Sequence, residues 1–425
     1  MKTTLHRLRT RALVCLGLLA LGTSLQAATL TIACGSNGQD YASCKRHTAD
    51  WAQKTGHTVK LYTTPSSSTD LLGEYRKLFD ASSPEVDVVM VDVVWPGLIK
   101  DHLVDLKKFS KNAEYHHFQA IVRNNTQDGK LLAMPWFTDA GLLFYRKDLV
   151  AKYSLRPPKT WDELAQVAQK IQTGERAAGV TQFQGFVFQA KAYEGLTCDA
   201  MEWLTAFDAG SIVDAKGEVT INNPNTVKAL KTAASWIGTI APRQVLDFGE
   251  EDARAVFQSG HAAFMRNWPY AWSMGNSADS PIKGKIGISP LPSSIPGGPR
   301  GATLGGWQLA VSKHSKNINL AADLVMYLTS APVQKERSIH GSYNPSLRAL
   351  YSDPEVLAAN PFLDELYKVF RAASPRPSTV TGARYSEVSE SFWNATREVL
   401  SGKTSAEDSV HRLDAQLKRI KRNAW

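Results

Sequence analysis

The sequence has few cysteines and, after its first 28 residues, no long apolar run. Four cysteines occur among 425 residues, and one of them, Cys15, lies in an apolar stretch near the N-terminus. A membrane-spanning helix needs about 20 consecutive, mostly apolar residues, and no later segment reaches that length. We therefore expect the chain beyond residue 28 to be soluble.

The common motifs of nucleotide-binding and hydrolytic enzymes are also missing. The sequence contains no P-loop, no G-x-G-x-x-G between a strand and a helix, no H-E-x-x-H and no G-x-S-x-G. His116 and His117 are adjacent but have no carboxylate at metal-ligand spacing, so we interpret them as solvated loop residues. We predict no metal site and no cofactor.

A strong excess of charge of one sign is absent as well. The 49 lysine and arginine residues exceed the 40 aspartate and glutamate residues by nine, and four of the cations lie in the first eleven residues. Proteins that bind nucleic acids gather basic residues into a stripe. No such run occurs before the last few residues, so we expect no nucleic-acid partner.

The first 27 residues have the pattern of a secretory signal peptide. Basic residues in M-K-T-T-L-H-R-L-R-T-R precede the apolar run A-L-V-C-L-G-L-L-A-L, and small residues follow at a cleavage position after Ala27 or Ala28. The pattern predicts that the mature chain is exported. Cys34, Cys44 and Cys198 would then meet an oxidising compartment. At most one disulfide can form; Cys34 and Cys44 are closest in sequence, and three buried thiols are an equally acceptable interpretation.

Strand and helix patterns alternate in the first part of the mature chain. Strands are predicted at 29–34, 57–62 and 86–91, and helices at 40–54 and 69–79. This alternation is typical of βαβ units with a parallel sheet, so the fold class is α/β. Ligands of such sheets bind beyond the carboxyl ends of the strands. Asp92 directly follows the third strand and therefore lies where a ligand would bind.

A second unit is predicted to begin near residue 131. Thr160 and Glu163 form a capping box at the start of an amphipathic helix. A strand pattern at 183–189 and a helical pattern at 195–209 follow. Residues 279–306 are rich in proline, glycine and serine, which predicts a crossing made mostly of loops.

Two carboxylates and a group of aromatic residues are the candidates for binding. Asp92 and Asp139 each stand in an apolar or aromatic setting, and an ionised carboxylate can accept hydrogen bonds from two neighbouring hydroxyls. The alternative is that each caps a turn. Eleven tryptophans include Trp268 and Trp307. Flat aromatic rings complement the apolar faces of a pyranose, whose edges carry the hydroxyls.

Six segments occur in an order that indicates a known family. They are D-V-V-M-V-D-V-V-W-P-G-L, M-P-W-F-T-D-A-G-L-L-F-Y-R-K-D-L, P-P-K-T-W-D-E-L, Y-E-G-L-T-C-D, A-V-F-Q-S-G-H-A-A-F-M-R-N-W-P-Y-A-W and L-G-G-W-Q-L-A-V-S-K. The mature chain resembles the extracellular solute-binding proteins, family 1, of ABC sugar importers. The likeness is to the maltose- and trehalose-binding branch.

This resemblance implies a two-lobed periplasmic-binding-protein fold with three crossings between the lobes. The crossings should lie near 135–142, 287–292 and 332–340. The N-terminal lobe would comprise 28–137 and 287–333, and the C-terminal lobe 138–286 and 334–425. The protein would be a periplasmic monomer that encloses a disaccharide such as maltose or trehalose and delivers it to an inner-membrane permease, without catalysis.

The resemblance also implies a set of sugar-contacting residues. These are Asp40, Asp92, Phe137, Asp139, Tyr193, Trp268, Tyr270, Gly306, Trp307 and Arg376. Phe137 stands where a tyrosine is frequent, and Leu71 stands where many relatives have an arginine, so the preferred disaccharide is open. Two alternatives remain from the residues alone: a secreted glycosidase that uses Asp92 and Asp139, and a binder of another solute, such as a polyamine or an anion.

Overall fold

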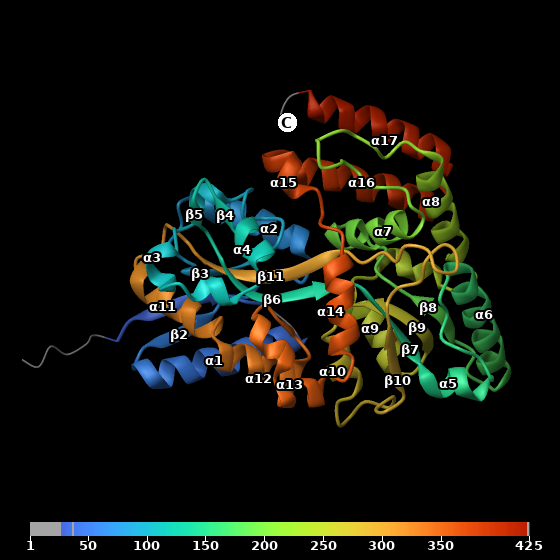
Figure 1. Ribbon diagram of the computed structural model, residues 1–425, viewed down its shortest axis with the longest axis horizontal. Helices are drawn as coiled ribbons and strands as arrows, with labels where there is room; N and C mark the ends of the chain where they lie inside the picture. The colour runs from blue at the N-terminus through green and yellow to red at the C-terminus, as the bar shows by residue number, and fades with distance from the viewer. Residues whose placement is uncertain (1–26, 36–37, 423–424) are drawn as a thin grey trace, which may run out of the picture.

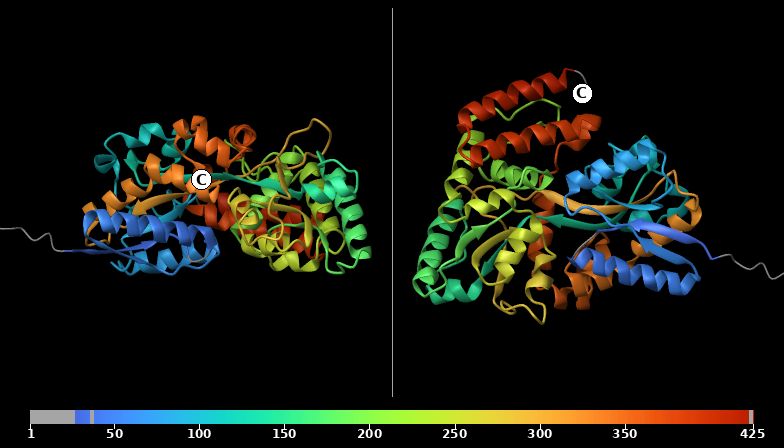
Figure 2. Two further views of the ribbon diagram at one scale, coloured as in Figure 1. Left: turned by 90° about the horizontal axis from the view of Figure 1, so that it is seen from below. Right: turned by 180° about the vertical axis from the view of Figure 1, so that it is seen from behind.

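Two α/β lobes lie side by side in the computed structural model, which describes residues 27–35, 38–422 and 425 (Figures 1 and 2). Each lobe is built around its own sheet and has its own hydrophobic core. The predicted signal peptide lies outside the described residues, except for Ala27. Within the described ranges, no helix combines the length and the apolar character that crossing a bilayer requires.

The N-terminal lobe contains a six-stranded sheet. Its strands, in spatial order, are β12 (Asn344–Pro345), β6 (Met134–Ala140), β11 (Leu304–Val311), β3 (Val88–Asp92), β1 (Thr29–Ala33) and β2 (Thr58–Leu61). The strands β2, β1 and β3 are parallel, as the alternating pattern predicts, whereas β11 runs antiparallel to both β3 and β6. All five residues of β3 are buried. Four apolar residues in a row before Asp92 suit a strand in the interior of a sheet that helices cover on both faces.

Helices on the two sides of this sheet complete the lobe. The main ones are α1 (Gly38–Thr55), α2 (Ser68–Asp80), α11 (Ile318–Leu328) and α12 (Ala331–Gly341), with the short helices α3 (Lys107–Ser110) and α4 (Gln119–Asn124) and the hairpin β4 (Thr126–Gln127) and β5 (Lys130–Leu131). Ser67 caps α2 by accepting a hydrogen bond from the Asp70 N–H.

The C-terminal lobe contains a four-stranded sheet and most of the long helices. The strand order is β10 (Ile286–Ser289), β7 (Leu142–Arg146), β9 (Ala262–Asn267) and β8 (Gln184–Val187). The helices are α5 (Lys147–Lys152), α6 (Trp161–Ala177), α7 (Glu194–Ala206), α8 (Pro224–Trp236), α9 (Glu250–Gln258), α10 (Ala271–Gly275), α16 (Tyr385–Leu400) and α17 (Ala406–Lys421). The predicted capping box at the start of α6 is confirmed, because Thr160 and Glu163 exchange side-chain to backbone hydrogen bonds.

The chain crosses between the lobes three times. It passes from β6 directly into β7 at Gly141, within the range 135–142. The second crossing lies later than predicted, because β10 still pairs with β7 and the chain joins the large sheet only with β11. The third also lies later than 332–340, since β12 still pairs with β6. It runs through α13 (Pro354–Ala359), α14 (Leu363–Ala372) and α15 (Ser378–Thr381) to α16 (Figure 1).

Both shifts change the lobe boundaries that the sequence predicted. Leu291 and Ala302 pack in the core of the C-terminal lobe, so residues 287–302 belong to that lobe and the N-terminal lobe resumes with β11. The short strand β10 was not predicted from the sequence. It lies in a stretch rich in proline, glycine and serine, and four residues are too few to show a clear strand periodicity.

The prediction that His116 and His117 are both solvated is wrong for the second residue. His116 is exposed, but His117 is 1% exposed and its Nδ1 lies 2.9 Å from Ser346 Oγ. Burial lowers the pKa of His117 to about 4. His117 is therefore a buried neutral histidine that packs the 113–118 segment against the residues directly after β12.

Cys34 and Cys44 form a disulfide, which resolves the alternative that the sequence left open. The bond joins the end of β1 to α1 with a Cα–Cα distance of 6.3 Å, while Cys198 is free and buried. Replacing both linked cysteines with serine is expected to lower the free energy of unfolding by about 3 kcal/mol, because the open chain gains loop entropy. Urea unfolding of the double variant measures this loss, and an unchanged midpoint would contradict it.

Candidate ligand-binding site

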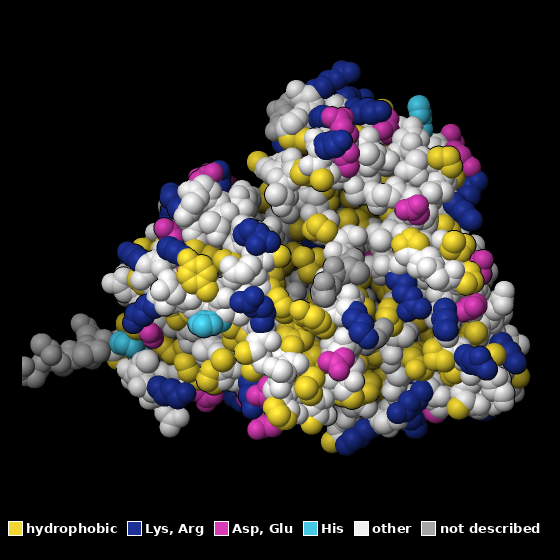
Figure 3. All heavy atoms as spheres, viewed as in Figure 1, with side chains coloured by type: hydrophobic (Ala, Val, Ile, Leu, Met, Phe, Trp, Pro, Cys, Tyr) yellow, Lys and Arg dark blue, Asp and Glu magenta, His cyan; other side chains and the backbone are white. Residues whose placement is uncertain are grey.

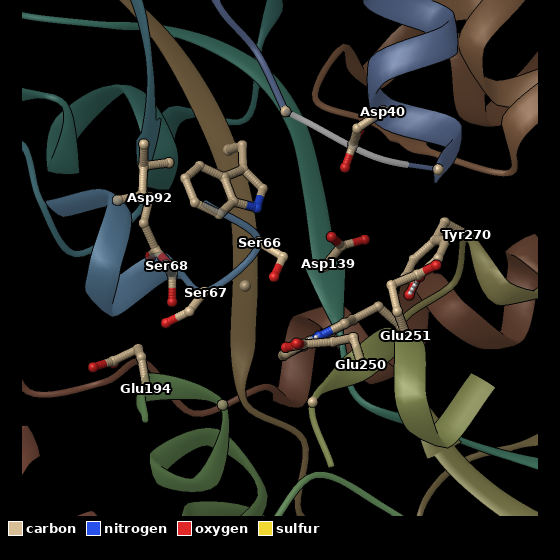
Figure 4. A pocket seen from close by; sticks show the side chains of 18 of the residues that line it. Asp40, Ser66, Ser67, Ser68, Asp92, Asp139, Glu194, Glu250, Glu251 and Tyr270 are labelled. Atoms are coloured by element: carbon tan, nitrogen blue, oxygen red, sulfur yellow. Dashed lines mark hydrogen bonds between the residues drawn. The ribbon is translucent and has the colours of Figure 1, made fainter. Parts of the chain in front are cut away.

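A cavity of about 240 Å³ lies between the two lobes. The face in Figure 3 is hollowed between the lobes, and hydrophobic side chains gather there. All ten residues that the family resemblance implied line this cavity. The lining also includes residues that were not predicted, among them Ser66, Ser67, Ser68, Glu194, Glu250 and Glu251. Figure 4 shows acidic and hydroxyl side chains from both lobes around a common space.

Arg376 joins the two lobes at one end of the cavity. Its guanidinium lies between Asp92, at the end of β3, and Glu194, the first residue of α7. The Nη2–Oδ1 distance to Asp92 is 2.6 Å, and the Nη1–Oε1 distance to Glu194 is 2.8 Å. Both carboxylates therefore share one buried cation. Arg376 was expected to contact a ligand, and the structure shows that two protein carboxylates already engage most of its donors.

Glu194 is an unpredicted residue whose carboxylate has three hydrogen-bonding side chains around it. Besides Arg376, it accepts hydrogen bonds from the hydroxyls of Tyr385 and Ser389. Burial raises the pKa of Glu194, and the neighbouring positive charge of Arg376 opposes this shift. Its backbone N–H donates to Thr69 Oγ1 at 3.2 Å. Thr69 belongs to α2 of the other lobe, so this bond closes one side of the cavity.

Asp139 is the carboxylate with the fewest protein partners in the cavity. It lies in β6 with 8% exposure, and no hydrogen bond or ion pair joins its carboxylate to any of the described residues. Burial raises its pKa well above 3.8, and the negative charge of Asp40 adds to the shift. A buried carboxyl group without protein partners is available to a ligand hydroxyl.

The raised pKa of Asp139 makes the stability of the ligand-free protein depend on pH. The folded state keeps this proton above the pH at which the unfolded chain loses it. The contribution to stability is therefore complete below about pH 4 and declines as the pH rises toward the folded-state pKa. We expect Asp139→Asn to become progressively more stable than the wild type as the pH rises. Urea midpoints across a pH series test this, and parallel profiles would contradict it.

Asp40 lies opposite, in the first turn of α1. Arg337 Nη2 is 3.3 Å from Asp40 Oδ1. The Arg337 guanidinium is buried, with its Cζ 3.9 Å from the ring centroid of Trp136 and 4.2 Å from that of Tyr343. Burial raises the pKa of Asp40, and Arg337 opposes the shift. The rings and the arginine together hold Asp40 at the cavity wall. Phe137 packs edge-on against Tyr343 and closes the same wall.

Trp307 forms the aromatic wall on the large sheet. It lies in β11 opposite Asp92 of β3 and is partly exposed. Trp95 supports it edge-on, with ring centroids 5.3 Å apart and planes at 88°, and Tyr75 supports Trp95 in the same way. This chain of perpendicular rings fixes the orientation of Trp307.

A second group of aromatic residues faces the cavity from the C-terminal lobe. The hydroxyl of Tyr193 donates to Glu250 at 2.6 Å, and that of Tyr270 donates to Glu251 at 2.5 Å. Trp268 Nε1 lies 3.4 Å from Glu250 Oε1. Both glutamates lie in the first turn of α9, where the helix dipole stabilises negatively charged side chains. The run E-E-D after a glycine is the sequence signal that marks this helix start.

Gly306 lets β11 bend against β6 beside Trp307. Its φ is +115°, and the register of the β6 pairing shifts between Trp307 and Gln308. A Cβ at this position would lie 2.6 Å from the carbonyl oxygen of Phe137. We expect Gly306→Ala to weaken ligand binding roughly tenfold or more and to cost about 1–3 kcal/mol of stability. Calorimetry and thermal unfolding measure the two effects; Gly297→Ala, also at positive φ but in open space, is the control.

A match to a family model covers most of this chain. Residues 35–335 match the model described as bacterial extracellular solute-binding protein. A probable ABC transporter-binding protein of Deinococcus radiodurans is 53% identical over 408 residues, which cover 96% of this chain and 97% of that protein. The chain belongs to the bacterial extracellular solute-binding proteins. Members of this family are substrate-binding proteins of ABC transporters and are not enzymes, which removes the glycosidase alternative.

Structural comparison places this solute-binding protein among the two-lobed proteins of its family. The structure titled maltose-bound MalE3 of T. maritima superposes with a TM-score of 0.87 and 40% identity, over 93% of this chain and 100% of that one. The maltodextrin-binding protein MdxE of Bacillus subtilis is 24% identical over 357 residues, 79% of this chain and 78% of that protein. The α/β fold with two lobes and three crossings is therefore confirmed.

Proposed function

We propose that this protein is the sugar-binding component of an ABC importer. It is exported to the periplasm, encloses a neutral disaccharide such as maltose or trehalose between its lobes, and delivers it unchanged to an inner-membrane permease. The observation that carries this proposal is the pairing of partly exposed tryptophan rings with Asp139, whose buried carboxyl group has no hydrogen-bond partner among the described residues.

The two kinds of wall suit the two kinds of surface on a pyranose. Trp307 and Trp268 present rings to the cavity, and a sugar ring offers apolar C–H faces to such planes. Asp139 and Asp40 present carboxyl oxygens, which suit the hydroxyl groups at the edge of the same ring. Each buried hydroxyl that lacks a partner costs roughly 1–3 kcal/mol, so this arrangement can select one sugar over an epimer.

The charges in the cavity favour an uncharged ligand. An anion would meet Glu250 and Asp252, which have no cationic partner among the described residues. A polyamine would need free carboxylates along its length, whereas Glu250 and Asp252 both lie in the first turn of α9. Arg376 neutralises Asp92 and Glu194, and burial favours the protonated form of Asp139. A neutral polyhydroxylated ligand is not repelled by the carboxylates and does not need them to be ionised.

Known relatives support a sugar as the ligand. The solved relative with 40% identity is described as bound to maltose, and the Bacillus subtilis relative is named for maltodextrin. Closure of the lobes around the ligand fits the three crossings and the hydrogen bond between Thr69 and Glu194, which links the lobes directly.

Isothermal titration calorimetry with a panel of ligands tests the proposal. Maltose, trehalose, mannitol, spermidine and inorganic phosphate would be titrated into the mature protein. We expect micromolar or tighter binding of at least one disaccharide, equivalent to about −8 kcal/mol or better, and recovery of the sugar unaltered. Binding of spermidine or phosphate with no response to the disaccharides would refute the proposal.

A further inference from the structure

A buried ion cluster lies behind the cavity wall of the C-terminal lobe. Arg266 on β9 is 2% exposed, and Asp199 and Glu202 on α7 are each 1% exposed. Arg266 Nε lies 2.8 Å from Glu202 Oε2 and 3.0 Å from Asp199 Oδ1, and its Nη2 also donates to Glu202. Its Nη1 donates to Gln189 Oε1 at 3.2 Å. These partners fix the guanidinium, and none of the four residues lines the cavity.

The fixed guanidinium of Arg266 faces the ring of Trp268. Its Cζ lies 3.9 Å from the ring centroid, within cation–π distance. The indole N–H is directed to Glu250, and a Cβ on Gly305 would lie 3.1 Å from Cζ3 of the ring. A face, the N–H group and an edge of Trp268 are therefore all restrained, while the residue still lines the cavity.

The same cluster touches two of the crossing segments. A Cβ on Gly141, between β6 and β7, would lie 2.0 Å from Glu202 Oε1 and 2.6 Å from Arg266 Nη2. The backbone N–H of Thr303, just before β11, donates to Glu202 Oε1 at 3.3 Å. Glu202 therefore pairs with Arg266, accepts a hydrogen bond from the segment before β11 and packs closely against Gly141.

We propose that Arg266 is a positioning residue that sets the plane of the Trp268 ring for stacking on the ligand. This inference rests on the proposed binding of a sugar in the cavity. The planar guanidinium can hold two carboxylates and cover the ring at the same time, whereas a lysine ammonium keeps the charge but loses the stacking plane. Arg266→Lys therefore separates positioning of the ring from neutralisation of Asp199 and Glu202.

A double-mutant cycle with maltose as the probe tests this role. Arg266→Lys is expected to weaken maltose binding about tenfold in the wild type, but no more than about twofold in a Trp268→Ala background, where there is no ring to position. Arg146→Lys is the matched control, since Arg146 is a buried bidentate arginine that pairs with Asp148 away from the cavity, and it should leave binding unchanged. An equal loss in both backgrounds would overturn the proposal.

A second measurement needs no ligand. In protein labelled with 5-fluorotryptophan, the ¹⁹F resonance of Trp268 is identified by its loss in Trp268→Phe. We expect Arg266→Lys to shift or broaden this resonance in the ligand-free protein, and Arg146→Lys to leave it in place. An unmoved Trp268 resonance would refute the positioning role. If maltose fails to bind the wild type, the proposed ligand is wrong, but this resonance still decides the role of Arg266.

Discussion

Replacing Trp307 with alanine is expected to abolish measurable sugar binding while both lobes remain folded. The ring lies in β11, is partly exposed to the cavity and is held edge-on by Trp95. Losing a pre-oriented aromatic contact at the centre of a site costs about 2–4 kcal/mol, which weakens binding roughly 30- to 700-fold. Calorimetry with the preferred disaccharide measures this loss.

A tryptophan away from the cavity provides the control for this experiment. Trp425 is also partly exposed, and its Nε1 donates to the carbonyl oxygen of Gly217 at 3.0 Å. Trp425→Ala should bind the sugar like the wild type. Circular dichroism and thermal unfolding would show that the Trp307 variant is folded. A dissociation constant within a few-fold of the wild-type value for Trp307→Ala would contradict the site assignment.

Asp139→Ala is expected to remove sugar binding as well, for a different reason. The carboxyl group is buried and has no hydrogen-bond partner among the described residues. A hydroxyl group of the bound sugar would supply that partner. Without it, a desolvated hydroxyl of the bound sugar stays unpaired. Asp139→Asn keeps one oxygen acceptor and should retain more affinity than Asp139→Ala. Titration of both variants with the preferred disaccharide gives the two dissociation constants.

A structural aspartate of the same lobe serves as the comparison. Asp323 accepts the indole N–H of Trp51 at 2.9 Å and does not line the cavity. Asp323→Ala should lower the unfolding temperature without changing the affinity for sugar. Asp139→Ala should weaken the affinity for sugar without lowering the unfolding temperature. If Asp139→Ala bound the sugar with near-normal affinity, the role proposed for this carboxyl group would be refuted.

Local patterns in the sequence predicted the elements that depend on near neighbours. The parallel strands β1, β2 and β3, the capping box of α6 and the position of Asp92 at the end of β3 follow from periodicity and caps within a few residues. Long-range pairing decided the rest. The strand β10 belongs to the C-terminal lobe because it pairs with β7, more than a hundred residues earlier in the chain.

The lining of the cavity divides in a similar way. The family likeness named ten residues, and all ten line one cavity, although their roles in binding remain part of the proposal. Glu194, Glu250 and Glu251 were missed because glutamates in the first turn of a helix are common, and nothing in the sequence shows which helix starts face the other lobe. Arg376 was named, but its pairing with Asp92 and Glu194 could not be foreseen.

The order of residues along this chain was enough to establish an α/β protein of the solute-binding family, since hydrophobic periodicity and short motifs are properties of neighbouring residues. Folding in three dimensions settled which cavity carboxylates have a cationic partner and which do not, because that depends on the cations that other segments bring within a few ångströms. Arg376, Arg337 and Arg266 each meet their acidic partners across gaps of many residues. Burial then sets the pKa of each group, and burial exists only once the two lobes have packed.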